Sequence, residues 1–380
     1  MRIALDLTAL TAASTGVDTY INDLVSHLAR IDTTNRYVLF LNFEDRHRFD
    51  HVLGRNMSAQ ALCVRPWPGR LLFQQCALPL AATSVDVIHS PSFLMPMWRG
   101  RARHLLTVHD MTFFSMPATH SRLHRSALYR RAVALSIRRA HLVNVPSSAT
   151  RQELLRCIPD FPEERVRVTP WGVNSRFCPS PRVDVDRHVR RLGVPIPYIL
   201  YVGTIEPRKN LLTAVEGFRR LIASGDSPMN LVFGGKFGWG DAEIFRRVAV
   251  PELRNRVHFL GYVQNDDLPW LYRGATLFVY PSLSEGFGFP PLEAMACGVP
   301  VVASLGSSLE ENLRGAAELV PATDADVLSS AMLRLITDLN RREQLIQLGL
   351  QRVVKFQWED TARAVLACYH ELFHGSPVAR

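Results

Sequence analysis

Two glutamates eight positions apart, Glu285 and Glu293, are the residues whose types and spacing most readily suggest chemistry in this chain. The apolar run 276–280 before them predicts a buried strand, and a loop rich in glycine and proline follows it. Pro291 and Gly298 suit the start and the end of a short helix that carries Glu293. Loop glycines allow backbone N–H groups to approach a polar ligand closely. The two carboxylates could each bind paired hydroxyl groups of that ligand.

Each glutamate also has an ordinary structural explanation. We expect Glu293 near the third position of its helix, where a carboxylate favours the helix dipole whatever the function, and Glu285 could be a solvated loop residue. The spacing alone does not decide between these roles, because two glutamates fall eight positions apart often by chance. The next apolar run, 299–303, predicts another strand. Strand, loop, helix and strand form a parallel α/β unit, which binds ligands at the carboxyl ends of its strands.

Arg208 and Lys209 form a second candidate group, directly after the predicted strand 198–203 and before a predicted helix. They could neutralise a diphosphate, with the arginine as a bidentate donor and the lysine as a point charge. An arginine–lysine pair is usually a surface feature. The position behind a strand and a glycine is therefore what favours a functional role.

Three further loops carry candidate residues. Gly16 opens the first helix, where backbone N–H groups bind phosphate, although capping by Ser14 or Thr15 explains the same pattern. His109 follows a predicted strand; a lone histidine is more often structural, but the carboxyl end of a strand in a doubly wound sheet favours a ligand role. Lys236 lies in a glycine-rich loop and could reach a base or a phosphate.

Strand-like and helix-like segments alternate along the chain in two series, which indicates two doubly wound parallel sheets. The predicted fold class is α/β, with two Rossmann-like domains facing a central cleft. Strands are expected at 3–7, 37–41, 85–89, 105–108 and 142–145, and then at 198–203, 230–233, 257–260, 277–280 and 299–303. Helices are expected at 17–30, 122–140, 325–355 and 359–373. The predicted boundaries are 1–178 for the first domain, 179–196 for a linker and 197–355 for the second domain.

Composition excludes several classes of protein. A chain of 380 residues with 47% hydrophobic and 21% charged residues is ordinary for a globular protein of two domains. No stretch approaches 18 apolar residues without a charge, and the first residues predict a strand, so neither a membrane-spanning helix nor a signal peptide is expected. The six cysteines are scattered without a C-x-x-C pair, which favours buried thiols of a cytosolic protein.

The net charge of +9 makes nucleic acid, membrane surfaces and anionic small molecules candidate partners. No recognisable nucleic-acid-binding motif is present, so no nucleic-acid partner is expected. Between Met111 and Gln152 there are seven arginines and no acidic residue, and apolar residues keep a helical spacing. A basic helix with an apolar stripe, here within Arg122–Arg139, can lie on an anionic membrane. An ordinary helix that packs on the core and exposes arginines to water explains the same pattern.

The stretch 285–303 resembles the E-x7-E signature of retaining glycosyltransferases of the two-domain GT-B type, specifically glycosyltransferase family 4. The segments 201–211, 107–112 and 13–20 are also similar to segments of that family. The resemblance covers nearly the whole chain and is most specific over 198–312. It implies that a hexose is transferred from a nucleotide diphospho-sugar to an acceptor hydroxyl, with retention at the anomeric carbon. In this family a final helix, here expected within 356–380, crosses back to the N-terminal, acceptor-binding domain.

The resemblance also implies roles for the basic and glycine positions. Arg208, Lys209 and the Gly16 loop would stabilise the departing diphosphate, and Lys236 would lie near the nucleotide. Many relatives carry a further basic residue directly after the strand glycine, where this chain has Thr204.

Other residues would hold the sugars of the donor. His109 would hydrogen-bond a hydroxyl of the transferred sugar near the reacting carbon, Glu285 would orient the same sugar, and Glu293 would hold the ribose hydroxyls. The backbone of the four following residues would also orient the hydroxyl groups of the transferred sugar: Gly286, Phe287, Gly288 and Phe289.

The string 202–210 further resembles bacterial mannosyltransferases of O-antigen and other surface polysaccharides, so GDP-mannose is the expected donor. The expected acceptor is a glycan or a polyprenyl-diphosphate-linked glycan. The expected location is cytoplasmic, with peripheral contact to the inner face of the membrane through Arg122–Arg139. A nucleotide-sugar hydrolase or epimerase on the same architecture, and a non-catalytic scaffold that binds glycan or membrane, remain alternatives.

No cofactor and no metal are expected. The two D-x-D strings, 184–186 and 324–326, each open a predicted helix, where acidic residues are favourable without any metal. Arg208 and Lys209 could take the place of a divalent ion at the diphosphate.

Overall fold

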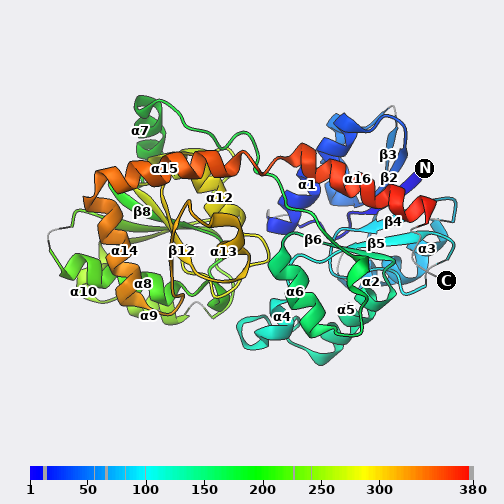
Figure 1. Cartoon of the computed structure of the whole chain (residues 1–380), viewed down its shortest axis with the longest axis horizontal. Coiled ribbons are helices and arrows are strands. Elements are labelled where there is room, and N and C mark those ends of the chain that lie inside the picture. The colour runs from blue at the N-terminus through cyan, green and yellow to red at the C-terminus, as the bar shows by residue number, and fades with distance from the viewer. Residues whose placement is uncertain are drawn as a thin grey trace. The chain divides into compact units, whose positions relative to one another are not determined.

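The structure is a computed structural model that describes residues 1–11, 15–54, 56–64, 67–81, 83–98, 100–225, 227–240 and 242–375. The chain divides into two compact units, which are described separately (Figure 1). The first unit comprises Met1–Ser115, Arg122–Gly172 and the segment that begins at Gln357, and the second comprises Met116–Ser121 and Val173–Phe356.

The first unit contains a parallel sheet of seven strands in the order β3-β2-β1-β4-β5-β6-β7. All five strands predicted for this half are present. The two others were missed because β3 is a partly exposed edge strand and β7 has only three residues. The strands are β1 (Arg2–Asp6), β2 (Arg36–Asn42), β3 (Met57–Leu62), β4 (Val87–Ser90), β5 (Arg103–Thr107), β6 (Leu142–Val145) and β7 (Val166–Val168).

Three helices of this unit, α1, α5 and α6, begin where a polar side chain caps them. Thr15 and Asp18 form a reciprocal capping box at the start of α1, and Ser126 accepts from the Tyr129 N–H at the start of α5. The helix predicted from residue 122 therefore begins only at Ala127. The helices are α1 (Gly16–Ile31), α2 (Trp67–Leu72), the π-helix η3 (Phe73–Ala77), α3 (Leu78–Ala81), α4 (Thr112–Ser115), α5 (Ala127–Arg139), α6 (Ser148–Cys157) and α16 (Trp358–His374), with 3₁₀ turns at Phe43–Asp45, Asp50–Val52 and Glu163–Arg165. A further 3₁₀ turn, Pro117–Thr119, belongs to the second unit.

The last helix, α16, belongs to the first unit and packs along α1. Gly172 approaches the backbone of Trp358 so closely that a Cβ atom there would lie 2.2 Å from the Trp358 nitrogen. His89 of β4 joins this helix to the sheet: its Nδ1 pairs with the Tyr369 hydroxyl of α16 at 2.7 Å, and its Nε2 pairs with the Thr107 hydroxyl of β5 at 2.8 Å. Trp358 and Tyr369 are buried, as expected for packing residues.

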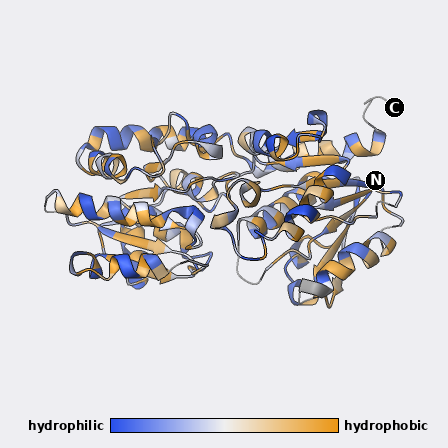
Figure 2. Cartoon of the chain, turned by 90° about the horizontal axis from the view of Figure 1, so that it is seen from below, coloured by the Kyte–Doolittle hydropathy of each residue, from blue (hydrophilic) through white to orange (hydrophobic). Residues whose placement is uncertain are grey.

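The second unit contains a parallel sheet of six strands in the order β10-β9-β8-β11-β12-β13. Its five predicted strands are present, and the short β13 was not predicted. The strands are β8 (Tyr198–Val202), β9 (Asn230–Gly234), β10 (Val257–Gly261), β11 (Leu277–Tyr280), β12 (Val301–Ser304) and β13 (Glu318–Val320). Figure 2 shows that the strands are mostly hydrophobic while the helices alternate in hydropathy, as buried parallel sheets require.

Two regions of the second unit differ from the sequence predictions. The segment 179–196, predicted as a linker, contains α7, whose His188 stacks on Trp270 of α11 with ring centroids 3.9 Å apart. The predicted helical region 325–355 is interrupted at Asp338, which caps a separate helix, α15. The helices are α7 (Arg182–Arg191), α8 (Leu211–Ala223), α9 (Ala242–Val248), α10 (Pro251–Arg254), α11 (Leu268–Gly274), α12 (Phe289–Ala296), α13 (Ser307–Leu313), α14 (Ala325–Thr337) and α15 (Leu339–Val353), with a 3₁₀ turn η6 at Pro207–Lys209.

Candidate active site

The loop after β8 carries the predicted cations and is fixed at its end by Asn210. This residue adopts a left-handed conformation (φ 55°) and forms the N-cap position of α8. Its side-chain amide donates to the carbonyl oxygens of Pro281 (3.1 Å) and Ala322 (2.6 Å). The loop that holds Arg208 and Lys209 is therefore tied to the loop that follows β11.

Arg208, Lys209 and Glu285 meet in one nearly buried cluster at the carboxyl ends of β8 and β11. Arg208 Nη1 lies 3.0 Å from Glu285 Oε2, and Lys209 Nζ lies 2.6 Å from Glu285 Oε1. Only 9–12% of each of these side chains is exposed. The sequence placed these residues in two separate motifs, and the structure brings them into direct contact.

Three residues that the sequence did not single out complete this cluster. Glu206 accepts from Arg208 at 2.8 Å, Ser282 donates to Glu285 Oε1 at 2.6 Å, and the Tyr280 hydroxyl accepts from Lys209 at 2.9 Å. Their positions carry a weak signal, since all three lie near the carboxyl end of a predicted strand. The cluster contains two cations and two carboxylates, so it is close to neutral.

The charges of the cluster depend on one another. Burial alone would raise the pKa of Glu285, but Arg208 and Lys209, together with hydrogen bonds from Lys209 and Ser282, lower it to about 2. Burial and the neighbouring Arg208 lower the pKa of Lys209, while Glu285 opposes that change. Glu285 is thus an ionised carboxylate that is paired with two cations. This excludes the simpler explanation, in which Glu285 is a solvated loop residue.

The backbone between Glu285 and α12 is held in place by α13. The Ser308 hydroxyl donates to the Glu285 carbonyl at 2.9 Å, and the Asn312 amide donates to the Phe287 carbonyl at 2.7 Å. Gly288 has φ 88°, and a Cβ atom there would lie 2.6 Å from Leu309 Cδ2. The left-handed conformation favours glycine at this position, and a larger residue would also displace the end of the Leu309 side chain.

Glu293 lies deeper in α12 than the sequence suggested. The helix begins at Phe289, so Glu293 is its fifth residue and not its third. Glu293 therefore lies beyond the first turn, where the helix dipole favours a carboxylate, and the dipole does not explain a glutamate at this position. The side chain is buried, and the Tyr272 hydroxyl of α11 donates to its Oε2 at 2.8 Å. Pro291 is the third residue of the helix, and Gly298 ends it with φ 75°.

Lys236 lies in a loop that packs directly on the Arg208 loop. The Lys236 carbonyl accepts from the Ile205 N–H at 3.0 Å, and a Cβ atom on Gly235 would lie 2.0 Å from the Gly203 carbonyl oxygen. The Lys236 side chain is partly exposed. The two glycines thus permit the close approach of two loops that both carry predicted donor-binding residues.

In the first unit, His109 is buried and held as one tautomer. Its Nε2–H donates to the Pro91 carbonyl at 2.8 Å, and the rings of Tyr20 and Trp171 pack against it. Burial lowers the pKa of His109, so the ring is neutral near pH 7. Its Nδ1 is buried without a hydrogen-bond partner in the described part of the chain. Nδ1 therefore offers a lone pair that can accept a hydrogen bond.

Gly16 is the first residue of α1 and is exposed. The Asp18 carboxylate accepts from the N–H groups of Thr11 (2.8 Å) and Thr15 (2.9 Å). Thr15 is the cap, while the other candidate, Ser14, lies outside the described residues. The structure thus supports the capping explanation and leaves the expected diphosphate contact of Gly16 a prediction.

The two D-x-D strings serve helix starts, as expected. Asp184 lies in the first turn of α7, and Asp324 caps α14 by accepting from two backbone N–H groups at 3.0 Å. Within the described ranges, no group of three or more histidine, cysteine, aspartate or glutamate side chains could hold a metal ion. Independence from metal remains a prediction.

Two family models match the chain. Residues 14–177 match the model "Glycosyltransferase Family 4", and residues 186–352 match "Glycosyl transferases group 1". The chain is 32% identical over 284 residues to an O-antigen chain mannosyltransferase B of Escherichia coli, and the match covers 74% of each protein. It is 34% identical over 229 residues to a D-inositol 3-phosphate glycosyltransferase of Salinispora tropica, of which it covers 47%.

Solved structures share the fold over the whole chain. A structure of Anabaena Alr3699/HepE in complex with UDP-glucose has a TM-score of 0.78 at 18% identity, and the match covers 98% of this chain and 100% of that chain. WaaG, a glycosyltransferase involved in lipopolysaccharide biosynthesis, has a TM-score of 0.74 at 14% identity over 98% of this chain and 100% of its own. The predicted fold, with two Rossmann-like sheets of the GT-B type, is confirmed.

Proposed function

We propose that this chain, which belongs to the group 1 and family 4 glycosyltransferases, transfers a mannosyl residue from GDP-mannose to a hydroxyl group of a glycan acceptor, with retention at the anomeric carbon. The O-antigen chain mannosyltransferase B of Escherichia coli, whose match covers 74% of this chain, supports this choice of sugar. The observation that carries the proposal is the buried cluster of Arg208, Lys209 and Glu285.

The cations of this cluster would stabilise the leaving group. A nucleoside diphosphate gains negative charge as the sugar leaves, and preorganised cations in a site that excludes water stabilise such charge strongly. Arg208 and Lys209 are held in place by Glu206, Tyr280 and Glu285 before any donor arrives. The oxygen of the acceptor hydroxyl would attack the anomeric carbon on the face from which the diphosphate leaves. An oxygen of the leaving phosphate would accept the proton of that hydroxyl.

The carboxylates and the histidine would orient the sugars. His109 Nδ1 would accept a hydrogen bond from a hydroxyl of the transferred sugar, because Nε2 already donates to Pro91. Glu285 would turn from its cations to the same sugar once the diphosphate binds them. Glu293 would hold the ribose hydroxyls from α12.

The acceptor would be linked to a polyprenyl diphosphate, and the enzyme would work in the cytoplasm at the inner face of the membrane. The support for this location is the basic region Arg122–Arg139, whose arginines could contact lipid phosphates.

The test is to incubate the purified protein with GDP-mannose, UDP-glucose, UDP-galactose and UDP-N-acetylglucosamine separately, in EDTA, and to measure release of the nucleoside diphosphate. We expect release from GDP-mannose that persists in EDTA and increases with an acceptor. Release from another donor would correct the sugar, and release that no acceptor increases would favour a hydrolase. Donor binding without release, even when acceptors are added, would favour a non-catalytic scaffold. The anomeric configuration of the product, determined by NMR, tests retention.

A further inference from the structure

A long part of the first unit is almost free of acidic residues. Between His51 and Gln152 there are thirteen arginines and only two acids, Asp86 and Asp110. Both acids serve local structure, because Asp86 accepts from the backbone N–H of Arg2 at 2.8 Å and Asp110 accepts from the hydroxyl of Thr112 at 2.6 Å. This part of the molecule is therefore strongly positive, and the charge is not balanced by neighbours in sequence.

Helix α5 presents an apolar and basic stripe to solvent. Leu128, Arg131 and Leu135 follow one another at helical spacing, so they lie on one face. Leu128 is 79% exposed and Leu135 is 41% exposed. The opposite face of the helix is fully buried through Val133 and Ile137. The core thus fixes the orientation of α5, and the exposed leucines are not needed for packing.

The turn before α5 continues this stripe. Leu123 is 47% exposed and lies between Arg122 and Arg125, which are also exposed. Within the described residues, no ion pair is found for Arg122, Arg125 or Arg131. Arg138, in contrast, is paired with Asp160 at 2.6 Å, so it adds little to the positive field.

A second exposed apolar group lies on segments that are hydrogen-bonded to the end of α5. Leu72, Leu80 and Trp98 are 66%, 60% and 56% exposed. Contacts through Met97 connect this group to α5, because the Met97 carbonyl accepts from Arg139 at 2.6 Å and the Met97 N–H donates to Gln75 of η3 at 2.8 Å. In Figure 1, α2 and α5 lie on the side of the sheet away from α16.

We propose that these residues form one docking surface for an anionic lipid bilayer. The docking surface consists of Leu72, Leu80, Trp98, Leu123, Leu128 and Leu135 together with Arg122, Arg125 and Arg131. The leucines and the tryptophan enter the interfacial region of the bilayer, while the arginines pair with lipid phosphates. Nucleic acid would satisfy the arginines but would leave the six apolar side chains in water.

This surface extends the membrane contact beyond Arg122–Arg139 and identifies apolar side chains as its anchors. Among the described residues, no helix is long and apolar enough to cross a membrane, so the contact is peripheral. It needs neither the donor nor the acceptor. Failure of the docking surface is therefore distinguishable from failure of the proposed transfer reaction.

The test is cosedimentation of the full chain with phosphatidylcholine vesicles that do or do not contain phosphatidylglycerol. We expect binding only to the anionic vesicles and a loss of binding at high salt, because salt screens the arginines. Leu128→Glu should reduce the partition coefficient about tenfold, because it removes one buried apolar anchor. Changing Arg122, Arg125 and Arg131 together to glutamine should reduce it about 100-fold.

The matched control is Leu339→Glu, because Leu339 of α15 is 60% exposed but belongs to the second unit. It should bind vesicles like the parent protein, and thermal unfolding should be unchanged in both leucine variants. Quenching of tryptophan fluorescence by brominated lipid should fall in Trp98→Phe. The proposal is overturned if anionic vesicles do not bind, if Leu339→Glu weakens binding as much as Leu128→Glu, or if the same surface binds duplex DNA and not lipid.

Discussion

Removing the charge of Glu285 should make the nucleoside diphosphate bind more tightly while the transfer reaction slows. In the structure, Glu285 forms ion pairs with both cations that the diphosphate would need, at 3.0 Å from Arg208 and 2.6 Å from Lys209. Under the proposed function, the phosphates would have to displace this carboxylate in order to bind the two cations. Glu285→Gln keeps the size of the side chain and removes the competing charge.

The size of the effect follows from the pKa of Glu285. Its fall from 4.5 to about 2 corresponds to a preference of about 3 kcal/mol for the ionised, paired side chain. That is the largest gain available to the diphosphate, equivalent to about 100-fold in affinity. The glutamine oxygen can still accept one hydrogen bond from a cation, so a gain of about tenfold is expected. The same substitution should destabilise the fold by about 3 kcal/mol, because two nearly buried cations lose a partner.

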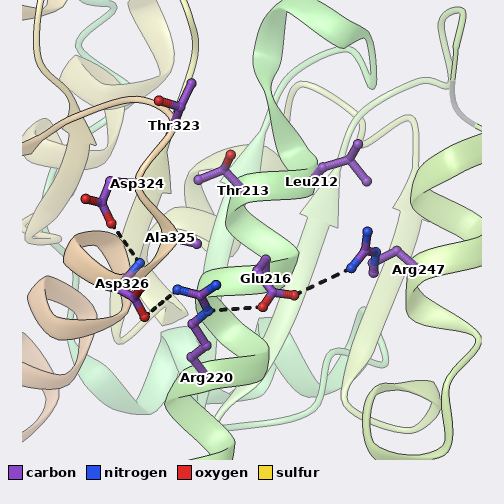
Figure 3. Close-up of a pocket in the computed structure, with 9 residues that line it drawn as sticks. All are labelled: Leu212, Thr213, Glu216, Arg220, Arg247, Thr323, Asp324, Ala325 and Asp326. Atoms are coloured by element: carbon purple, nitrogen blue, oxygen red, sulfur yellow. Dashed lines mark hydrogen bonds and ion pairs between the residues drawn. The ribbon is translucent and has the colours of Figure 1, made fainter.

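Isothermal titration calorimetry with GDP and with UDP measures the affinity, and release of nucleoside diphosphate from the donor measures turnover. The matched control is Glu216→Gln, because arginines also lower the pKa of Glu216 to about 2. Its partners Arg220 and Arg247 line a separate groove of about 510 Å³, together with Asp326 (Figure 3). Nucleotide affinity should not change in this control. Unchanged or weaker binding by Glu285→Gln would refute the competition between carboxylate and diphosphate.

Three further predictions follow from single contacts. Lys209→Ala should abolish most transfer while the protein remains folded, and an unchanged rate of nucleoside diphosphate release would contradict the role of this lysine. Gly235→Ala should lower the free energy of unfolding by more than about 3 kcal/mol in urea titrations, because its Cβ would lie 2.0 Å from the Gly203 carbonyl oxygen. Gly315→Ala, which has φ 79° but no atom within 4 Å, should cost only about 1 kcal/mol for its backbone conformation. Burial lowers the pKa of His89 to about 3 in the folded state, so stability should be intact above pH 6.5 and fall by up to about 3 kcal/mol between pH 6.5 and 4. The free energy of unfolding, measured with urea at several pH values in this range, should depend less steeply on pH in His89→Asn than in the parent protein. An identical dependence would show that His89 is not the cause.

The strands that were predictable from the sequence are those with continuous apolar runs. β8 and β11 consist only of apolar and aromatic residues, almost all of them buried, and they stand out for this reason. β3 was missed because it lies at the edge of its sheet and exposes several polar residues. The region 179–196 is predicted as a linker because the turn-rich segment 177–182, with Pro179 and Pro181, lies at its start. Three of its residues are buried: Val185 and Val189 in α7, and Val194 after it.

The site was predictable as a set of motifs and not as a set of contacts. Lys209 and Glu285 are 76 residues apart, and nothing in either motif indicates that the lysine pairs with the glutamate. The sequence predicts Glu293 at the third position of its helix, because Pro291 suits the first helical position. Proline is tolerated anywhere in the first turn, where its missing N–H group would have no partner within the helix. The α12 helix therefore begins two residues earlier, at Phe289.

The return of α16 to the first unit also determines the order in which the protein can be completed during synthesis. In the chain, the main part of the second unit, Val173–Phe356, is an insertion between β7 and α16. The ribosome therefore finishes Val173–Phe356 while the first unit still lacks the helix that covers Tyr20 and satisfies His89. Until α16 emerges, His89 and the neighbouring apolar surface are exposed to solvent and to chaperones. A circular permutant in which α16 precedes β1 would remove this delay and should give fewer aggregates during synthesis in a cell-free translation system.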